Sequence, residues 1–122
     1  MNAQGPAPRR PAVHQLLVND KALSLMIDAI AKLSHQRRRF ATLSDVLLHA
    51  LEHQTEAESP AISDLGALQS LVGEHKVYVR IPRESARQFA ALKHRVGDAL
   101  PGKSAVREAV CYCCLIILNC KN

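Results

Sequence analysis

Residues 76–82, with the sequence KVYVRIP, decide the fold of this chain of 122 residues. Apolar residues occupy every second position of this stretch, which is the period of a strand with one buried face. Pro82 ends the strand and suits the first turn of a helix. Apolar residues recur at helical spacing over residues 83–96, and Ser104 is the expected N-cap of a second helix. Residues 76–122 are therefore predicted to form a strand followed by two helices.

The same order of elements appears about sixty residues earlier in the chain. Residues 13–18 (VHQLLV) are β-prone, and the Asn-Asp pair that follows can cap a helix whose apolar residues recur at spacings of three and four. After a basic turn at residues 36–39, Thr42 and Asp45 have the spacing of a capping box for a second helix. The chain thus contains the same strand–helix–helix pattern twice.

Charge divides the chain into three parts. Residues 9–51 carry seven basic and three acidic side chains, whereas residues 76–122 carry nine basic and three acidic ones. Between these basic parts, the connecting residues hold five acidic side chains and no basic one. This shift in composition predicts an acidic linker over residues 55–75, with room for one short helix. Residues 1–12 contain three prolines and an Arg-Arg pair, and are predicted to form a flexible basic arm.

A single strand–helix–helix unit leaves both edges of its strand unpaired and a wide apolar face uncovered. Two copies in one chain can complete each other if their strands pair and their helices close over one face of the pair. The predicted fold is therefore mainly α with a two-stranded antiparallel ribbon. Residues 13–54 and 76–122 would be two ribbon-helix-helix repeats (βαα) that form one domain as an intramolecular pseudo-dimer.

The stretch KVYVRIPRE (76–84), followed by GKSAVREAV (102–110), resembles the ribbon-helix-helix DNA-binding family of the Arc and MetJ type. The resemblance lies in a basic-apolar strand that ends in proline, and in the Gly-Lys-Ser that opens the second helix. Residues 13–54 match by layout more than by motif. The fused arrangement is similar to TraY-type relaxosome proteins of conjugative plasmids and to the fused virulence protein that binds T-DNA borders.

The resemblance implies that the ribbon enters the major groove of double-stranded DNA, where each base pair presents a distinct pattern of donors and acceptors. Arg80 is the strongest candidate, because a guanidinium can bond both acceptors of guanine at once. The two strands carry different outward side chains, so the half-site should not be palindromic. The expected base-contacting residues are Lys76, Tyr78 and Arg80 in the second strand and Val13, Gln15 and Leu17 in the first.

Phosphate contacts are expected at the start of the second helix of each repeat. Backbone N–H groups and the helix dipole favour an anion there, and nearby cations add to the attraction. Such contacts position a protein on DNA and carry little sequence information. The expected phosphate-binding residues are Lys103 and Ser104 in one repeat, Arg37, Arg38, Arg39, Thr42 and Ser44 in the other, and Arg9 and Arg10 in the arm.

Other site types have weaker support in the sequence. His49 and His53 have a spacing that can hold a metal ion on a helix, but no third ligand is evident, so no metal site is expected. The cysteines around Cys113 lie in a helix that is apolar on nearly every side, which favours reduced thiols packed in the core over a zinc site. The chain has no phosphate-cradling glycine loop and no nucleophile motif. We expect no enzymatic activity, no catalytic residues and no cofactor.

The net charge of +5 favours an acidic partner such as DNA, while an aromatic content of 3% argues against a sugar cleft or a single-strand stacking platform. No apolar run is long enough for a membrane span, and a cytoplasmic location is expected. Both a transcriptional regulator and a relaxosome accessory protein fit these features. Further partners would be a relaxase or another DNA-processing protein, and a second copy on an adjacent site. The alternative is an antitoxin-like interaction module without a DNA site of its own.

Overall fold

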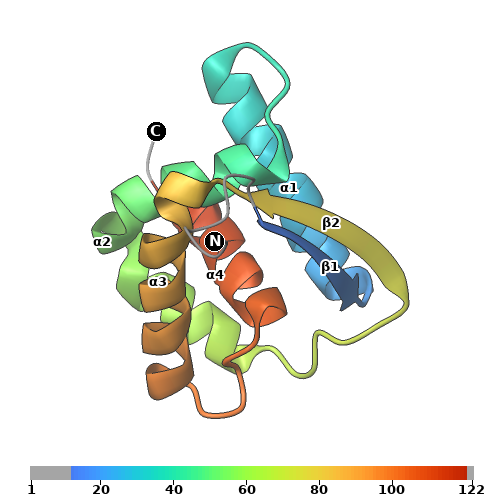
Figure 1. Cartoon of the computed structure of the whole chain (residues 1–122), viewed down its shortest axis with the longest axis vertical. Helices are drawn as coiled ribbons and strands as arrows, with labels where there is room; N and C mark the ends of the chain where they lie inside the picture. Colours follow the sequence, from blue (N-terminus) through green and yellow to red (C-terminus); the bar gives the residue numbers. More distant parts are fainter. Residues whose placement is uncertain (1–11, 121–122) are drawn as a thin grey trace, which may run out of the picture.

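A computed structural model describes residues 12–120 of the chain (Figure 1). Each half of the chain contributes one strand followed by helices, in the order predicted from the sequence. The described part is mainly helical, with one two-stranded sheet. The elements are β1 (Ala12–Val18), α1 (Asp20–Arg37), α2 (Leu43–Ala67), β2 (His75–Ile81), the short 3-10 helix η1 (Arg83–Ser85), α3 (Ala86–Ala99) and α4 (Val106–Asn119). Arg9 and Arg10 lie outside the described residues.

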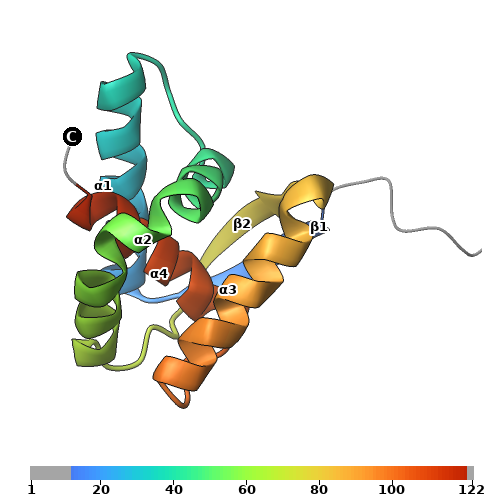
Figure 2. The ribbon, with the colours of Figure 1, turned by 90° about the vertical axis from the view of Figure 1, so that its left-hand side faces the viewer.

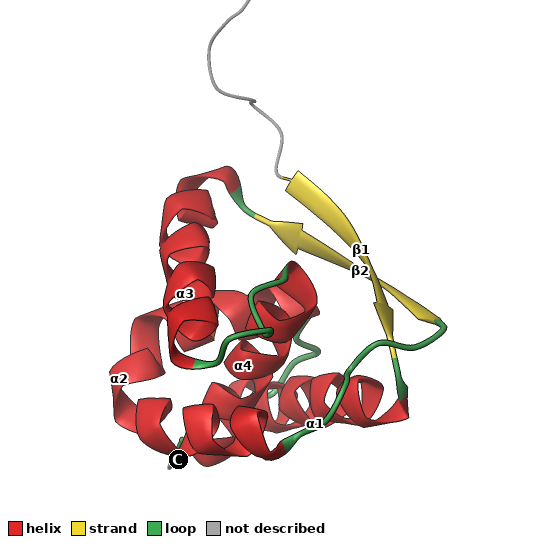
Figure 3. Cartoon of the chain, turned by 90° about the horizontal axis from the view of Figure 1, so that it is seen from below, coloured by secondary structure: helices red, strands yellow, loops and turns green. Residues whose placement is uncertain are grey.

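The two strands pair with each other along their whole length, which confirms the predicted antiparallel ribbon. Ala12 lies opposite Ile81 at one end, and Val18 lies opposite His75 at the other. The helices all lie on one side of the ribbon, and the other side faces solvent (Figure 3). The inner face contributes Leu16, Val18, Val79 and Ile81 to the core, each 5% exposed or less.

Helix α4 lies at the centre of the helical layer and contacts α1, α2 and α3 (Figure 2). Its most extensive contacts are with α2, the second helix of the N-terminal half, and the next most extensive are with α1. Every residue from position 108 to 117 is buried, in agreement with the prediction that the cysteines of this helix, apolar on nearly every side, pack in the core. A helix with no polar face can be stable in water only when it is covered on all sides.

The four cysteines are free thiols, and the three that lie in α4 are fully buried. Burial raises the pKa of Cys111 and of Cys113 to about 12, so both stay protonated at neutral pH. A neutral thiol packs as a small apolar group and is a poor nucleophile and metal ligand. These residues therefore fill the core, as the sequence predicts.

Asn19 joins the start of α1 to the connection that precedes β2. Its side-chain oxygen accepts a hydrogen bond from the backbone N–H of Ala22 at 2.9 Å, and its side-chain nitrogen donates to the carbonyl of Ser70 at 2.7 Å. Its backbone N–H donates to the carbonyl of Leu71 at 2.9 Å. A Cβ atom at Gly73 would overlap the backbone of Asn19, so only glycine lets the connection pass this closely.

We expect Asn19→Ala to lower the free energy of unfolding by about 1–2 kcal/mol, because it removes an N-cap and the bond to Ser70. Asn19→Asp is the matched control, since a carboxylate still accepts from Ala22 and favours the helix dipole but cannot donate to Ser70. Urea unfolding followed by circular dichroism measures both variants. Equal losses in the two variants would show that the cap contributes nothing.

The first part of the expected linker over residues 55–75, which had room for one short helix, is helical, because α2 continues through it to Ala67. The helix is bent, with non-helical backbone at His53 and Ala57. Pro60 accounts for the second bend, since it has no N–H to donate and its ring crowds the preceding turn. The helix continues despite the proline because this part has an apolar side facing the core, where Ala57, Ala61 and Leu65 are fully buried.

Candidate nucleic-acid interface

The outer face of the ribbon brings together all the residues predicted to contact bases. The strand register places them in three directly opposed pairs: Val13 with Arg80, Gln15 with Tyr78, and Leu17 with Lys76. All of these side chains are exposed, whereas the residues between them in each strand are buried or half-buried, namely His14, Leu16, Val77 and Val79. The outward positions expected from the sequence are therefore confirmed in both strands, and the half-buried His14 lies on the inner face.

The chemistry of this face is mixed. One strand presents two cationic groups and a phenol, and the other presents an amide between two aliphatic side chains. Tyr78 is 62% exposed, Val13 61% and Leu17 43%, which is a high exposure for apolar side chains. Exposure of an apolar group to water is unfavourable, so a partner that covers it lowers the free energy of the complex. This face could donate hydrogen bonds, accept them and contact a methyl group.

The start of α2 lies against the end of β2 that carries Arg80. The Ser44 hydroxyl donates a hydrogen bond to the backbone carbonyl of Arg80. The predicted capping box is confirmed: the Thr42 hydroxyl accepts from the backbone N–H of Asp45 at 3.1 Å, and the Asp45 carboxylate accepts from the Thr42 N–H at 2.9 Å. The Ser44 hydroxyl thus holds the start of α2 beside the ribbon, which was not predicted, whereas the Thr42 hydroxyl caps its own helix as predicted.

The three arginines before α2 differ in their surroundings. Arg37 is half-buried and lies 3.8 Å from the Asp45 carboxylate, so part of its charge is balanced within the chain. Arg38 ends α1 in the left-handed conformation with φ of 58°. Arg38 and Arg39 are both exposed and line a hollow of about 410 Å³ together with Phe40. These two side chains are the cations that this turn offers to an anionic partner.

Phe40 was not singled out in the sequence, although it is 96% exposed beside the arginines. An aromatic side chain next to a run of arginines at a helix break was the available signal. Such a side chain loses little conformational entropy on binding and can stack on a partner.

The start of α4 differs from its prediction. Ala105, and not Ser104, is the N-cap, and no side chain caps the helix. Ser104 instead packs against α3 at Gly97, where a Cβ atom would lie 2.7 Å from the Ser104 Cβ. Ala105, the next residue, has the extended backbone conformation of an N-cap.

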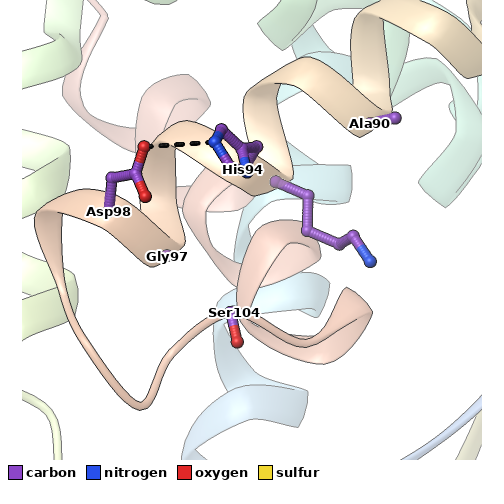
Figure 4. Close-up of a pocket in the computed structure, with 6 residues that line it drawn as sticks. Ala90, His94, Gly97, Asp98 and Ser104 are labelled. Carbon is purple, nitrogen blue, oxygen red and sulfur yellow. Dashed lines mark ion pairs between the residues drawn. The ribbon is translucent and has the colours of Figure 1, made fainter.

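Figure 4 shows Ser104 beside a pocket of about 360 Å³ on this side of α3, near the ion pair between His94 and Asp98, whose atoms lie 3.3 Å apart. The Lys103 ammonium group lies 3.4 Å from the carbonyl of Gln69. Glu108 in the first turn is buried and accepts from Arg107 at 2.9 Å. Each of the two predicted phosphate sites therefore has a carboxylate in the first turn of its helix with an arginine beside it, Asp45 with Arg37 in α2 and Glu108 with Arg107 in α4.

The structure also brings together three potential metal ligands that the sequence reading did not combine. His49, Glu52 and His53 lie on one side of α2, with their ligand atoms all within 4.8 Å of one another. The expectation that no third ligand is near the two histidines is therefore wrong. The signal was available, because Glu52 lies three residues after His49 on the same helix.

No protein family, curated protein or solved structure matches this chain in comparisons of its sequence and fold. Within residues 12–120, none of the helices combines the length and apolar character needed to cross a lipid bilayer.

Proposed function

We propose that the protein binds double-stranded DNA at a specific sequence by inserting the β1–β2 ribbon into the major groove. The observation that carries this proposal is the register of the ribbon, which places six exposed side chains of varied hydrogen-bonding character on one uncovered face. A two-stranded ribbon has the dimensions to enter the major groove. Its other face is fixed to the core, so the side chains are held on a rigid support.

We further propose that the two halves are ribbon-helix-helix repeats joined as an intramolecular pseudo-dimer. Two features support this reading: the strands of the halves pair antiparallel, and the second helices, α2 and α4, pack on each other. The halves are unequal, since α2 has 25 residues and α4 has 14. Because linkage in one chain holds both halves together at any dilution, the ribbon would form without a second copy.

The roles of the outer side chains follow from their chemistry. Arg80 and Lys76 would donate to the two acceptors of guanine, and Gln15 would bond adenine through its amide. Val13 and Leu17 would contact thymine methyl groups. Opposed positions on the two strands carry different residues, so the preferred site should lack two-fold symmetry. Arg38 and Arg39 would contact flanking phosphates and fix the position of the ribbon.

A transcriptional regulator and an accessory protein of plasmid DNA transfer would use this surface in the same way. The two roles differ in where the site lies, at a promoter or at a transfer origin, and in whether a relaxase or another DNA-processing protein binds beside it. Recovery of the site in its genomic context would distinguish them.

Selection of bound duplexes from a random pool tests the proposal. We expect enrichment of one asymmetric site, with an affinity that falls linearly with salt on logarithmic axes because phosphate contacts release counterions. The unselected pool is the control for non-specific binding. Binding of the selected and unselected duplexes with equal affinity would overturn the proposal, and so would the absence of any DNA binding at low salt.

A further inference from the structure

The metal-ligand cluster on α2, formed by His49, Glu52 and His53, lies outside the ribbon face and plays no part in the proposed DNA contact. The three residues occur at spacings of three and four, so they share one side of the helix. Their ligand atoms all lie within 4.8 Å of one another, and the two imidazole rings are stacked with centroids 4.3 Å apart. Rotation of the side chains alone can bring such atoms to the separation that a shared tetrahedral ion requires, about 3.3 Å for bonds of about 2.05 Å.

A fourth residue orients one of the ligands. The Nδ1 atom of His53 lies 2.6 Å from a carboxylate oxygen of Glu56. An ionised carboxylate only accepts hydrogen bonds, so Nδ1 carries the proton and the lone pair of Nε2 is available to a metal ion. This arrangement of carboxylate, histidine and metal is the usual way in which proteins fix the tautomer of a ligating histidine.

We propose that His49, Glu52 and His53 bind one divalent transition-metal ion of the Zn²⁺ class. Two imidazole nitrogens and one carboxylate oxygen suit this class, whereas Mg²⁺ and Ca²⁺ prefer ligands that are all oxygen. Two of the ligands precede the non-helical backbone of His53 and the third is His53 itself, so a bound ion holds this residue against the preceding turn of α2. Because the ion binds the folded chain, it stabilises that state.

Calorimetric titration of the full chain with Zn²⁺ tests the proposal directly. We expect one ion to bind per chain and the melting temperature to rise with Zn²⁺ concentration. Glu52→Gln changes an exposed side chain and should fold normally, yet it should lower the affinity by more than about tenfold. His49→Ala and His53→Ala should abolish the thermal shift. Zn²⁺ binding to all three variants as tightly as to the wild-type chain would overturn the proposal.

Two further variants test specificity. His94→Ala is the matched control. His94 also pairs with a potential ligand four residues away, Asp98, but this exposed pair lies on a different helix, α3. We expect this variant to bind Zn²⁺ like the wild-type chain. Glu56→Gln should weaken binding about tenfold while the visible spectrum of bound Co²⁺ stays that of a nitrogen and oxygen site. Sulfur-to-cobalt absorption bands, lost in Cys120→Ser, would overturn the assignment by placing the ion at the half-buried thiol.

Discussion

Arg80→Ala is expected to weaken binding to the selected duplex by about 1–3 kcal/mol, and to weaken binding to random DNA far less. The guanidinium group stands on the outer ribbon face opposite Val13, where it can bond a base edge with two donors at once. Competition binding at fixed salt measures both affinities. Arg87→Ala is the matched control, because it removes an exposed arginine from α3 and should leave the preference for the selected duplex unchanged.

The structure allows this result to be separated from damage to the fold. The contact that Arg80 makes with Ser44 uses its backbone carbonyl, which alanine retains. Within residues 12–120, Arg80 forms no ion pair that the substitution would break. The free energy of unfolding of the variant should therefore lie within about 0.5 kcal/mol of the wild-type value. An equal loss of affinity for selected and random duplexes would mean that Arg80 contacts phosphate and not a base.

The ribbon could be predicted from sequence because its signal is local and periodic. Val77, Val79 and Ile81 alternate with polar residues, and a strand of period two has only one way to bury them together. The helix starts at Asn19 and Thr42 were predictable for a similar reason, since a cap depends on side chains within three residues of it.

The path of α2 depends on tertiary contacts, and sequence reasoning missed it for that reason. Acidic residues and Pro60 are local signals for a linker, but burial of Ala61 and Leu65 against the core outweighs them. The start of α4 was shifted by one residue in the same way. Serine is a favourable residue type for an N-cap, but Ser104 packs against Gly97 of α3 instead. This tertiary contact was not predicted from the sequence.

The residues of the candidate sites also differ in whether local sequence or tertiary contacts determine their roles. The ribbon face follows from strand alternation, so all six of its residues could be named from sequence. The role of Ser44 could not, because its hydroxyl bonds a carbonyl 36 residues away, whereas the capping role of Thr42 is local and was predicted. A prediction of phosphate contacts from residue type alone could not identify which side chains the fold already uses.

Ile116→Ala should have the largest effect on stability, with a loss of about 2–5 kcal/mol in the free energy of unfolding. Ile116 has no solvent exposure and lies in α4, the helix that both α1 and α2 contact. Truncation removes buried apolar atoms and leaves a cavity that the surrounding helices cannot fill. A domain of this size has a total stability of about 5–15 kcal/mol, so the loss would be a large fraction of it.

Ile27→Ala provides the matched control, since it makes the same chemical change at a side chain of α1 that is 56% exposed. We expect this control to lose less than about 1 kcal/mol. Urea unfolding followed by circular dichroism measures both variants. If the free energy of unfolding falls with urea concentration at an unchanged slope, the same surface is exposed on unfolding. Because α4 holds the helices of both halves behind the ribbon, Ile116→Ala should also lower DNA affinity at temperatures near its melting point. Similar losses of stability in the two variants would show that α4 is not the centre of the core.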